Sequence, residues 1–111
     1  MNGRIENLHH ALYPRQTVLV TSSLNGRDNV LALDWSMPVS FDPFMIAIAI
    51  GKTRHSFDTI SKSREFVLAV VPFSLKEKVL YCGSKSGRNG EDKFAKSGLA
   101  KNTPCRVKAP L

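Results

Sequence analysis

The sequence predicts one mainly β domain with short helices, folded as a barrel or a strongly curved sheet. Runs of β-branched and apolar residues form four strands, most of which follow one another along the chain. Turn residues separate these strands, and no repeat or low-complexity linker divides the chain. Its 111 residues suit a single domain with a modest core. Residues 1–12 are expected to be an N-terminal arm or a short helix, and residues 13–111 the domain itself.

The first two strands are predicted to form a hairpin over residues 16–34. Residues 17–21 are β-branched and apolar, a composition that strands favour, and residues 29–33 return with a similar one. Asn25-Gly26 lies between them and is a strong signal for a tight hairpin turn.

Two further strands follow. Residues 45–50 come after the turn at Asp42-Pro43 and form a continuous apolar run. Such a run is typical of a strand that is buried on both faces or lines a barrel. Residues 65–71 form the fourth strand, which Pro72 ends because proline has no N–H for the ladder.

Three short helices complete the predicted elements. Thr53 is expected to cap a helix over residues 54–62, since a threonine side chain accepts hydrogen bonds from the first backbone N–H groups of a helix. Ser74 begins a second helix, which reaches about residue 82, and residues 93–97 form the third.

The chain carries a formal net charge of +7, with a sequence pI near 9.8. This charge favours an anionic partner, such as a phosphate-bearing cofactor, nucleic acid or an anionic surface, although a solvated basic surface explains it equally well. The aromatic content of 8% and the lack of an RNA-module signature make nucleic acid the weaker alternative.

The sequence shows neither a membrane segment nor a signal peptide. The longest apolar run, residues 44–50, is far too short to span a membrane, and the N-terminus lacks an apolar core. Cys82 and Cys105 are too few for a disulfide framework, which suits a reducing compartment. We therefore expect a soluble cytoplasmic protein with no membrane and no nucleic-acid partner.

No metal site and no catalytic side chain stand out. His9-His10 are adjacent, so they would point in different directions on a helix, and no third ligand has a recognisable spacing. A surface pair is the better interpretation. No acid, base or nucleophile lies in a catalytic pattern.

The segment from Asn29 to Ser40 starts as a strand and becomes a run of small and polar residues. Ser36 and Ser40 offer hydroxyls, Trp35 offers a flat apolar surface, and Pro38 cannot donate a ladder hydrogen bond. The run is therefore expected to leave the sheet or follow its edge. It suits a flat ligand with polar edges; an ordinary strand-to-loop transition with a core tryptophan is the alternative.

Residues 51–56 come directly after the third strand and lead into the first helix. Unpaired N–H groups, the helix dipole and the cations Lys52 and Arg54 converge there, which favours an anion site. The G-x-x-x-x-G-K spacing of a P-loop is absent. The alternative is a helix start with basic surface residues.

Several short motifs occur in a fixed order from about residue 13 to the end of the chain. Together they resemble the flavin reductase-like, FMN-binding split-barrel family, and especially its flavoredoxin-type branch. The motifs are Tyr13-Pro14, Asn29 with residues 36–40, Asp42-Pro43, Lys52-x-Arg54-x-Ser56, residues 65–68, Cys82-Gly83, residues 86–88, residues 92–94 and Gly98-Leu99.

The resemblance implies a Greek-key-like split β-barrel that binds FMN without a covalent link, usually as a homodimer. It also implies electron transfer from NADH, NADPH or another reductant to flavin or a downstream acceptor, with the chemistry supplied by the cofactor. The flavin ring would lie along residues 29–40, and residues 52–56 would meet its phosphate. The implied cofactor-binding residues are Asn29, Asp34, Trp35, Ser36, Met37, Pro38, Val39, Ser40, Lys52, Arg54, His55 and Ser56.

The chain departs from this family in one respect. The family's domains are longer, and the resemblance stops before the last barrel strands, so we expect an incomplete barrel or one that a second copy or a partner completes. A flavin-binding or structural split-barrel protein without reductase activity is the alternative function. Cys82 is a candidate for redox chemistry beside a flavin, but with no Cys-x-x-Cys partner a structural role is the simpler interpretation.

Overall fold

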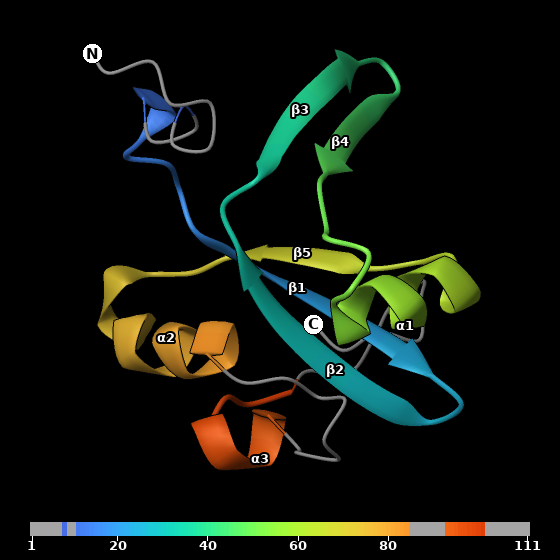
Figure 1. Cartoon of the computed structure of the whole chain (residues 1–111), viewed down its shortest axis with the longest axis vertical. Helices are drawn as coiled ribbons and strands as arrows, with labels where there is room; N and C mark the ends of the chain where they lie inside the picture. Colours follow the sequence, from blue (N-terminus) through green and yellow to red (C-terminus); the bar gives the residue numbers. More distant parts are fainter. Residues whose placement is uncertain (1–7, 9–10, 85–92, 102–111) are drawn as a thin grey trace.

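Five strands form two antiparallel sheets, and short helices pack around the larger sheet (Figure 1). The structure is a computed structural model, and it describes residue 8, residues 11–84 and residues 93–101. The mainly β architecture with short helices confirms the predicted fold class. The elements in chain order are β1 (Val18–Leu24), β2 (Arg27–Leu33), β3 (Ser36–Phe41), β4 (Phe44–Ile48), α1 (His55–Ser63), β5 (Val67–Val70), η2 (Phe73–Leu75), α2 (Lys76–Ser84) and α3 (Lys93–Ser97).

The larger sheet has the strand order β2-β1-β5. A tight turn joins β1 to β2, and its central residues Asn25 and Gly26 both have positive φ, of 53° and 79°. Positive φ at both central positions is typical of a type I′ turn, and asparagine followed by glycine adopts it at little cost. The predicted hairpin over residues 16–34 is therefore confirmed.

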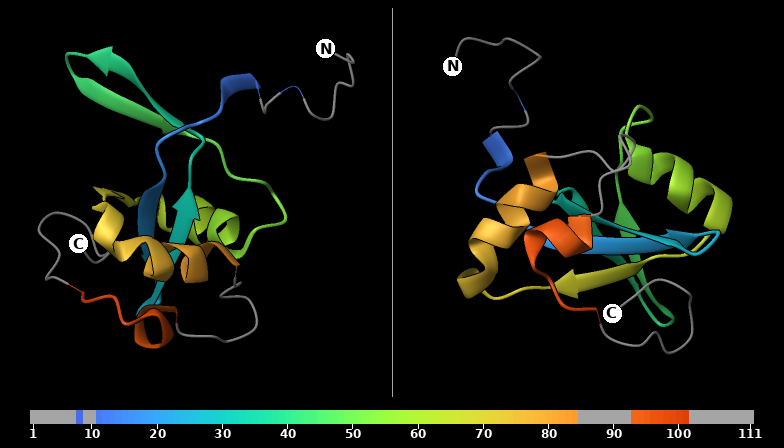
Figure 2. Two further views of the ribbon diagram at one scale, coloured as in Figure 1. Left: turned by 90° about the vertical axis from the view of Figure 1, so that its left-hand side faces the viewer. Right: turned by 90° about the horizontal axis from the view of Figure 1, so that it is seen from below.

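Strand β1 is buried on both faces because helices cover both sides of the larger sheet (Figure 2). On one face α2 and α3 pack on Leu19 and Val30, and together with Val79, Cys82 and Phe94 these residues form the apolar core. On the other face α1 packs on β1 and β2. This double burial accounts for the continuous apolar start of β1.

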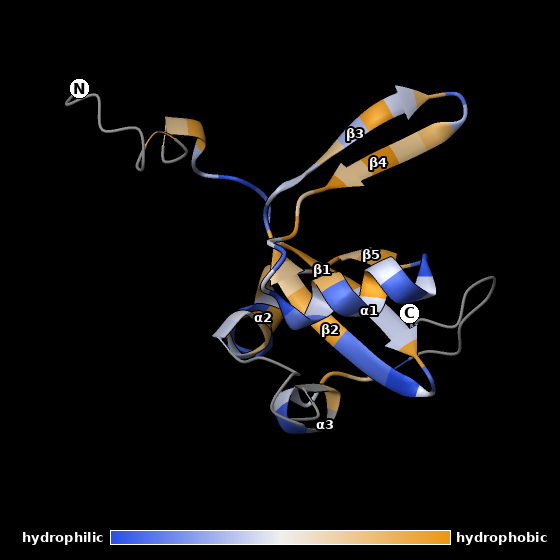
Figure 3. Cartoon of the chain, turned by 45° about the vertical axis from the view of Figure 1, so that its right-hand side comes forward, coloured by the Kyte–Doolittle hydropathy of each residue, from blue (hydrophilic) through white to orange (hydrophobic). Residues whose placement is uncertain are grey.

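Strands β3 and β4 form a separate two-stranded sheet that projects from the larger one (Figures 1 and 3). We call this pair the hairpin arm. Its large exposed apolar side chains range from 36% exposure at Ile46 to 100% at Phe41. The prediction that residues 45–50 are buried on both faces is therefore wrong. The strand ends at Ile48, and among the described elements it packs mainly on β3.

Residues 36–40 leave the larger sheet, as predicted, and belong to strand β3 of the second sheet, so the alternative of a strand-to-loop transition is wrong. Strand β3 pairs with β4 in antiparallel orientation, with Pro38 opposite Ile46 and Ser40 opposite Met45. The register shift between Pro38 and Ser40 leaves Val39 as an extra residue in the strand. A bulge at this point is consistent with the missing N–H of Pro38.

The helices differ from their predicted limits mainly at their starts. Helix α1 begins at His55 with Arg54 as its N-cap and no side-chain cap, so the prediction of Thr53 as the cap is wrong. The second predicted helix is a short 3₁₀ turn, η2, followed by α2. None of the described helices is long and apolar enough to cross a membrane. His9-His10, Cys105 and most of residues 1–12 lie outside the described residues.

Candidate functional site

The connection Asp34-Trp35 carries the chain from the larger sheet into the hairpin arm. Residues from two other segments donate hydrogen bonds to the backbone carbonyls in and next to this connection. Arg15 donates from Nε to the Asp34 carbonyl at 2.8 Å and from Nη2 to the Ser36 carbonyl at 3.4 Å. The Ala49 N–H donates to the Trp35 carbonyl at 2.9 Å. Three consecutive carbonyls are thus bonded to partners outside the segment, which fixes the backbone that carries the Trp35 ring.

A pocket with a volume of about 550 Å³ lies at this connection, and we call it the junction pocket. Trp35, which is 49% exposed, and Arg54, which is also exposed, both line it. The pocket therefore offers a flat aromatic surface and a guanidinium to the same ligand. Its full lining is Tyr13, Leu31, Ala32, Leu33, Asp34, Trp35, Ala49, Ile50, Gly51 and Arg54.

The chain between β4 and α1 turns tightly before the helix begins. The Arg54 N–H donates to the Gly51 carbonyl at 3.0 Å, and the Phe57 N–H donates to the Arg54 carbonyl at 3.1 Å. The first N–H groups of α1 carry the positive end of the helix dipole, and the exposed cations Lys52 and Arg54 stand next to them. Asp58 in the first turn is the one acidic residue there. The predicted anion site thus has a positive helix start at the edge of the junction pocket.

A buried hydrogen bond ties this helix start to the larger sheet. The side-chain amide of Asn29 on β2 donates to the Ser56 hydroxyl on α1 at 2.7 Å, and both side chains are buried. Asn29 lies opposite Ser22 in the β1–β2 register, and the hydroxyl of Ser22 is buried without a hydrogen-bond partner. Because a buried polar group is costly to leave unpaired, the Asn29–Ser56 bond favours one position of α1 on the sheet.

The fold and its motifs have counterparts among known proteins. The sequence profile of the family described as flavin reductase like domain matches residues 9–111. The chain belongs to the flavin reductase-like domain family. This membership confirms the resemblance inferred from the motifs.

Individual relatives cover nearly all of this flavin reductase-like domain. A protein of Archaeoglobus fulgidus is 34% identical over 110 residues, which are 99% of this chain and 61% of that protein. The flavoredoxin of Desulfovibrio vulgaris superposes with a TM-score of 0.81 at 30% identity, over 89% of this chain and 54% of the flavoredoxin. An FMN-binding protein of Thermus thermophilus, solved with bound p-hydroxybenzaldehyde, superposes with a TM-score of 0.82 at 26% identity, over 100% of this chain and 60% of that one.

These similarities confirm the predicted split-barrel fold class. The chain spans about three-fifths or less of the length of these relatives. The similarity extends over both sheets described above.

The structure brings some of the predicted site residues of this flavin reductase-like domain together and separates others. Asp34, Trp35 and Arg54 line one pocket, and Lys52 and His55 flank Arg54 in the chain. Asn29 on β2 and Ser56 on α1 are both buried, and the Asn29 side-chain amide donates a hydrogen bond to the Ser56 hydroxyl. The other predicted residues line no part of the junction pocket and lie on the hairpin arm: Ser36, Met37, Pro38, Val39 and Ser40.

Arg15 is a functional candidate that the sequence did not reveal, and Tyr13 and Gly51 lie in predicted motifs but were not predicted as cofactor-binding residues. Arg15 holds the segment that carries Trp35, while Tyr13 and Gly51 line the junction pocket. An arginine directly before the first strand was the one available signal, but nothing in the sequence indicates its partners 19 and 21 residues away. Among the described residues, no three His, Cys, Asp or Glu side chains lie close enough together to hold a metal ion.

Proposed function

We propose that this chain binds FMN without a covalent link and takes part in electron transfer from a nicotinamide or another reductant to flavin or to a downstream acceptor. Family membership and the similarity to a flavoredoxin and an FMN-binding protein support this proposal. The observation that carries it in this chain is the junction pocket, which Trp35 and Arg54 line together.

The residues of the junction pocket suit the two chemically different ends of FMN. A volume of about 550 Å³ is within the usual range for ligand pockets of roughly 300–1,000 Å³. The isoalloxazine is flat and largely apolar, so it suits the Trp35 ring and the aliphatic end of β2. The phosphate is an anion, and Arg54, Lys52 and the start of α1 are positive.

When bound, FMN would supply the redox chemistry, as flavins do in general. The chain's own residues would bind and orient it. Arg15 and Ala49 would keep Trp35 in place through the carbonyls of residues 34–36. Asn29 and Ser56 would hold the start of α1 at a fixed position on the sheet, and with it the cations that meet the phosphate. We assign no side chain as an acid, base or nucleophile.

We also propose that the chain assembles as a homodimer through the hairpin arm. Isolated two-stranded sheets are marginally stable in water, and exposed apolar patches of this kind commonly mark protein–protein contacts. Phe41 and Phe44, at 100% and 67% exposure, would be central in such a contact. We expect sedimentation equilibrium to show a dimer for the unmodified chain and a monomer for Phe44→Lys. A monomeric unmodified chain would contradict the proposal.

A visible absorption spectrum tests the cofactor directly. We expect the purified chain, mixed with excess FMN and then desalted, to retain flavin absorption bands, and NADH or NADPH to bleach them under anaerobic conditions. Retained bands without bleaching by either nicotinamide would favour another reductant or the alternative of a flavin-binding protein without reductase activity. A colourless protein after desalting, together with no binding of FMN in an equilibrium titration, would refute FMN binding by this chain.

A further inference from the structure

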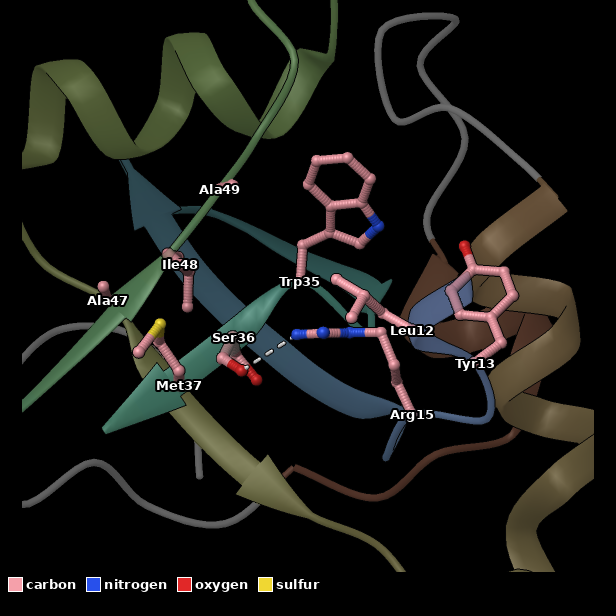
Figure 4. A pocket seen from close by; sticks show the side chains of 9 residues that line it. All are labelled: Leu12, Tyr13, Arg15, Trp35, Ser36, Met37, Ala47, Ile48 and Ala49. Atoms are coloured by element: carbon pink, nitrogen blue, oxygen red, sulfur yellow. Dashed lines mark hydrogen bonds between the residues drawn. The ribbon is translucent and has the colours of Figure 1, made fainter. Parts of the chain in front are cut away.

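A second pocket lies on the hairpin-arm side of Trp35 (Figure 4), and we call it the arm pocket. Its volume is about 260 Å³, roughly half that of the junction pocket. Leu12, Met37 and Ile48 give it an almost entirely apolar lining. This volume is below the usual range for drug-sized ligands, so the arm pocket suits a molecule with one ring.

Arg15 is the one permanently charged side chain that lines the arm pocket. Its two hydrogen bonds to the carbonyls of Asp34 and Ser36 fix the guanidinium, and Figure 4 shows it directed at Ser36. An arginine has more N–H donors than these two bonds use. No carboxylate of the described residues forms a salt bridge with Arg15. The arm pocket therefore holds a half-buried cation that lacks a counter-ion from the described chain.

We propose that the arm pocket is a second ligand site, for a small flat organic acid whose carboxylate binds Arg15 and whose ring lies among the apolar side chains. A cation in apolar surroundings is costly unless it is paired, and a carboxylate matches the planar donor geometry of a guanidinium. The site is separate from the junction pocket, with which it shares only Tyr13, Trp35 and Ala49. The proposal does not depend on flavin binding, because Arg15 and the apolar lining are contributed by the chain itself.

The charge requirement can be tested with two probes of the same shape. Benzoate carries a carboxylate, and benzamide replaces it with a neutral amide. Trp35 is the only tryptophan in the sequence and lines the arm pocket, so its fluorescence reports binding to the flavin-free chain. We expect benzoate to bind at least about tenfold more tightly than benzamide, the effect of one charge-assisted hydrogen bond.

Substitutions show whether Arg15 causes this preference. Arg15→Met keeps the aliphatic stem and removes the charge, and we expect it to abolish the preference for benzoate. Arg15→Lys keeps the charge and should retain part of the preference, which controls for any movement of the Trp35 segment. Arg64→Met is the matched control, since Arg64 is an exposed arginine beyond the end of α1 and lines neither pocket. It should bind both probes like the unmodified chain.

Five results would overturn the proposal, and four of them concern the choice of ligand and variant. They are equal binding of benzoate and benzamide by the unmodified chain, loss of the preference in Arg64→Met, equal loss in Arg15→Lys and Arg15→Met, and displacement of benzoate by FMN. A benzoate affinity that falls as the protein concentration rises would show that a second copy covers the arm pocket, and would also overturn it. Since every binding measurement except the displacement uses flavin-free protein, failure here is distinguishable from failure of the FMN proposal.

Discussion

Replacing Arg54 with alanine is expected to weaken FMN binding about tenfold to a hundredfold and to leave riboflavin binding unchanged. The two ligands share the isoalloxazine ring and the ribityl chain, and only FMN has the phosphate. A hydrogen bond to a charged group contributes about 1.5–3 kcal/mol, and each 1.4 kcal/mol is about a factor of ten in affinity. Because Arg54 is exposed, part of this effect is expected to be screened at high salt.

Parallel titrations of FMN and riboflavin against the unmodified chain and Arg54→Ala measure this difference. Arg64→Ala, beyond the opposite end of α1, is the control for a general loss of positive charge, and we expect it to bind both flavins normally. Equal weakening of FMN and riboflavin in Arg54→Ala would show that Arg54 does not contact the phosphate.

Replacing Phe94 with alanine is expected to lower the free energy of unfolding by about 3–5 kcal/mol. Phe94 is 5% exposed and packs in the core with Val79 and Cys82 of α2 and Leu19 of β1. The ammonium of Lys101 lies 4.8 Å from the centre of its ring. The substitution therefore leaves a cavity and also removes a cation–π contact.

Phe73→Ala is a matched control for this loss of stability, because the Phe73 side chain is 81% exposed and also has a lysine, Lys76, above its ring at 5.0 Å. We expect it to change the free energy of unfolding by less than about 1 kcal/mol. Urea denaturation followed by circular dichroism measures both variants. If they lost the same free energy, Phe94 would not be a core residue.

The sequence predicted best the parts of the fold that local chemistry decides. Asn25-Gly26 specifies its turn through the φ angles it permits, so the first hairpin could be predicted without knowing its neighbours. Burial was harder to predict. An apolar run indicates that a strand would be stabilised by burial, but it does not show which element packs against the strand. Strand β4 has the composition of a buried strand and is exposed. The sequence does not predict β3 as a strand, because Pro38 cannot donate a ladder hydrogen bond, although a bulge accommodates that residue in the strand.

The candidate site was predictable in its parts but not in its assembly. A few neighbouring residues predict Trp35 as a flat apolar surface and Arg54 as part of an anion site, and the family resemblance adds that the anion is the FMN phosphate. That both line one pocket depends on where the chain turns between the sheets, which composition does not encode. The role of Arg15 depends on hydrogen bonds to backbone carbonyls, and any residue can supply a carbonyl.

The position of the junction pocket between two separate sheets has a thermodynamic consequence. The hairpin arm packs mainly on itself among the described elements, and two hydrogen bonds from Arg15 hold the connection that joins the arm to the larger sheet. A ligand in the junction pocket beside Trp35 would restrict the motion of the hairpin arm relative to the larger sheet. A partner molecule bound to the arm would restrict the same motion. Linkage then requires reciprocity: association would tighten ligand binding by the same factor by which the ligand tightens association.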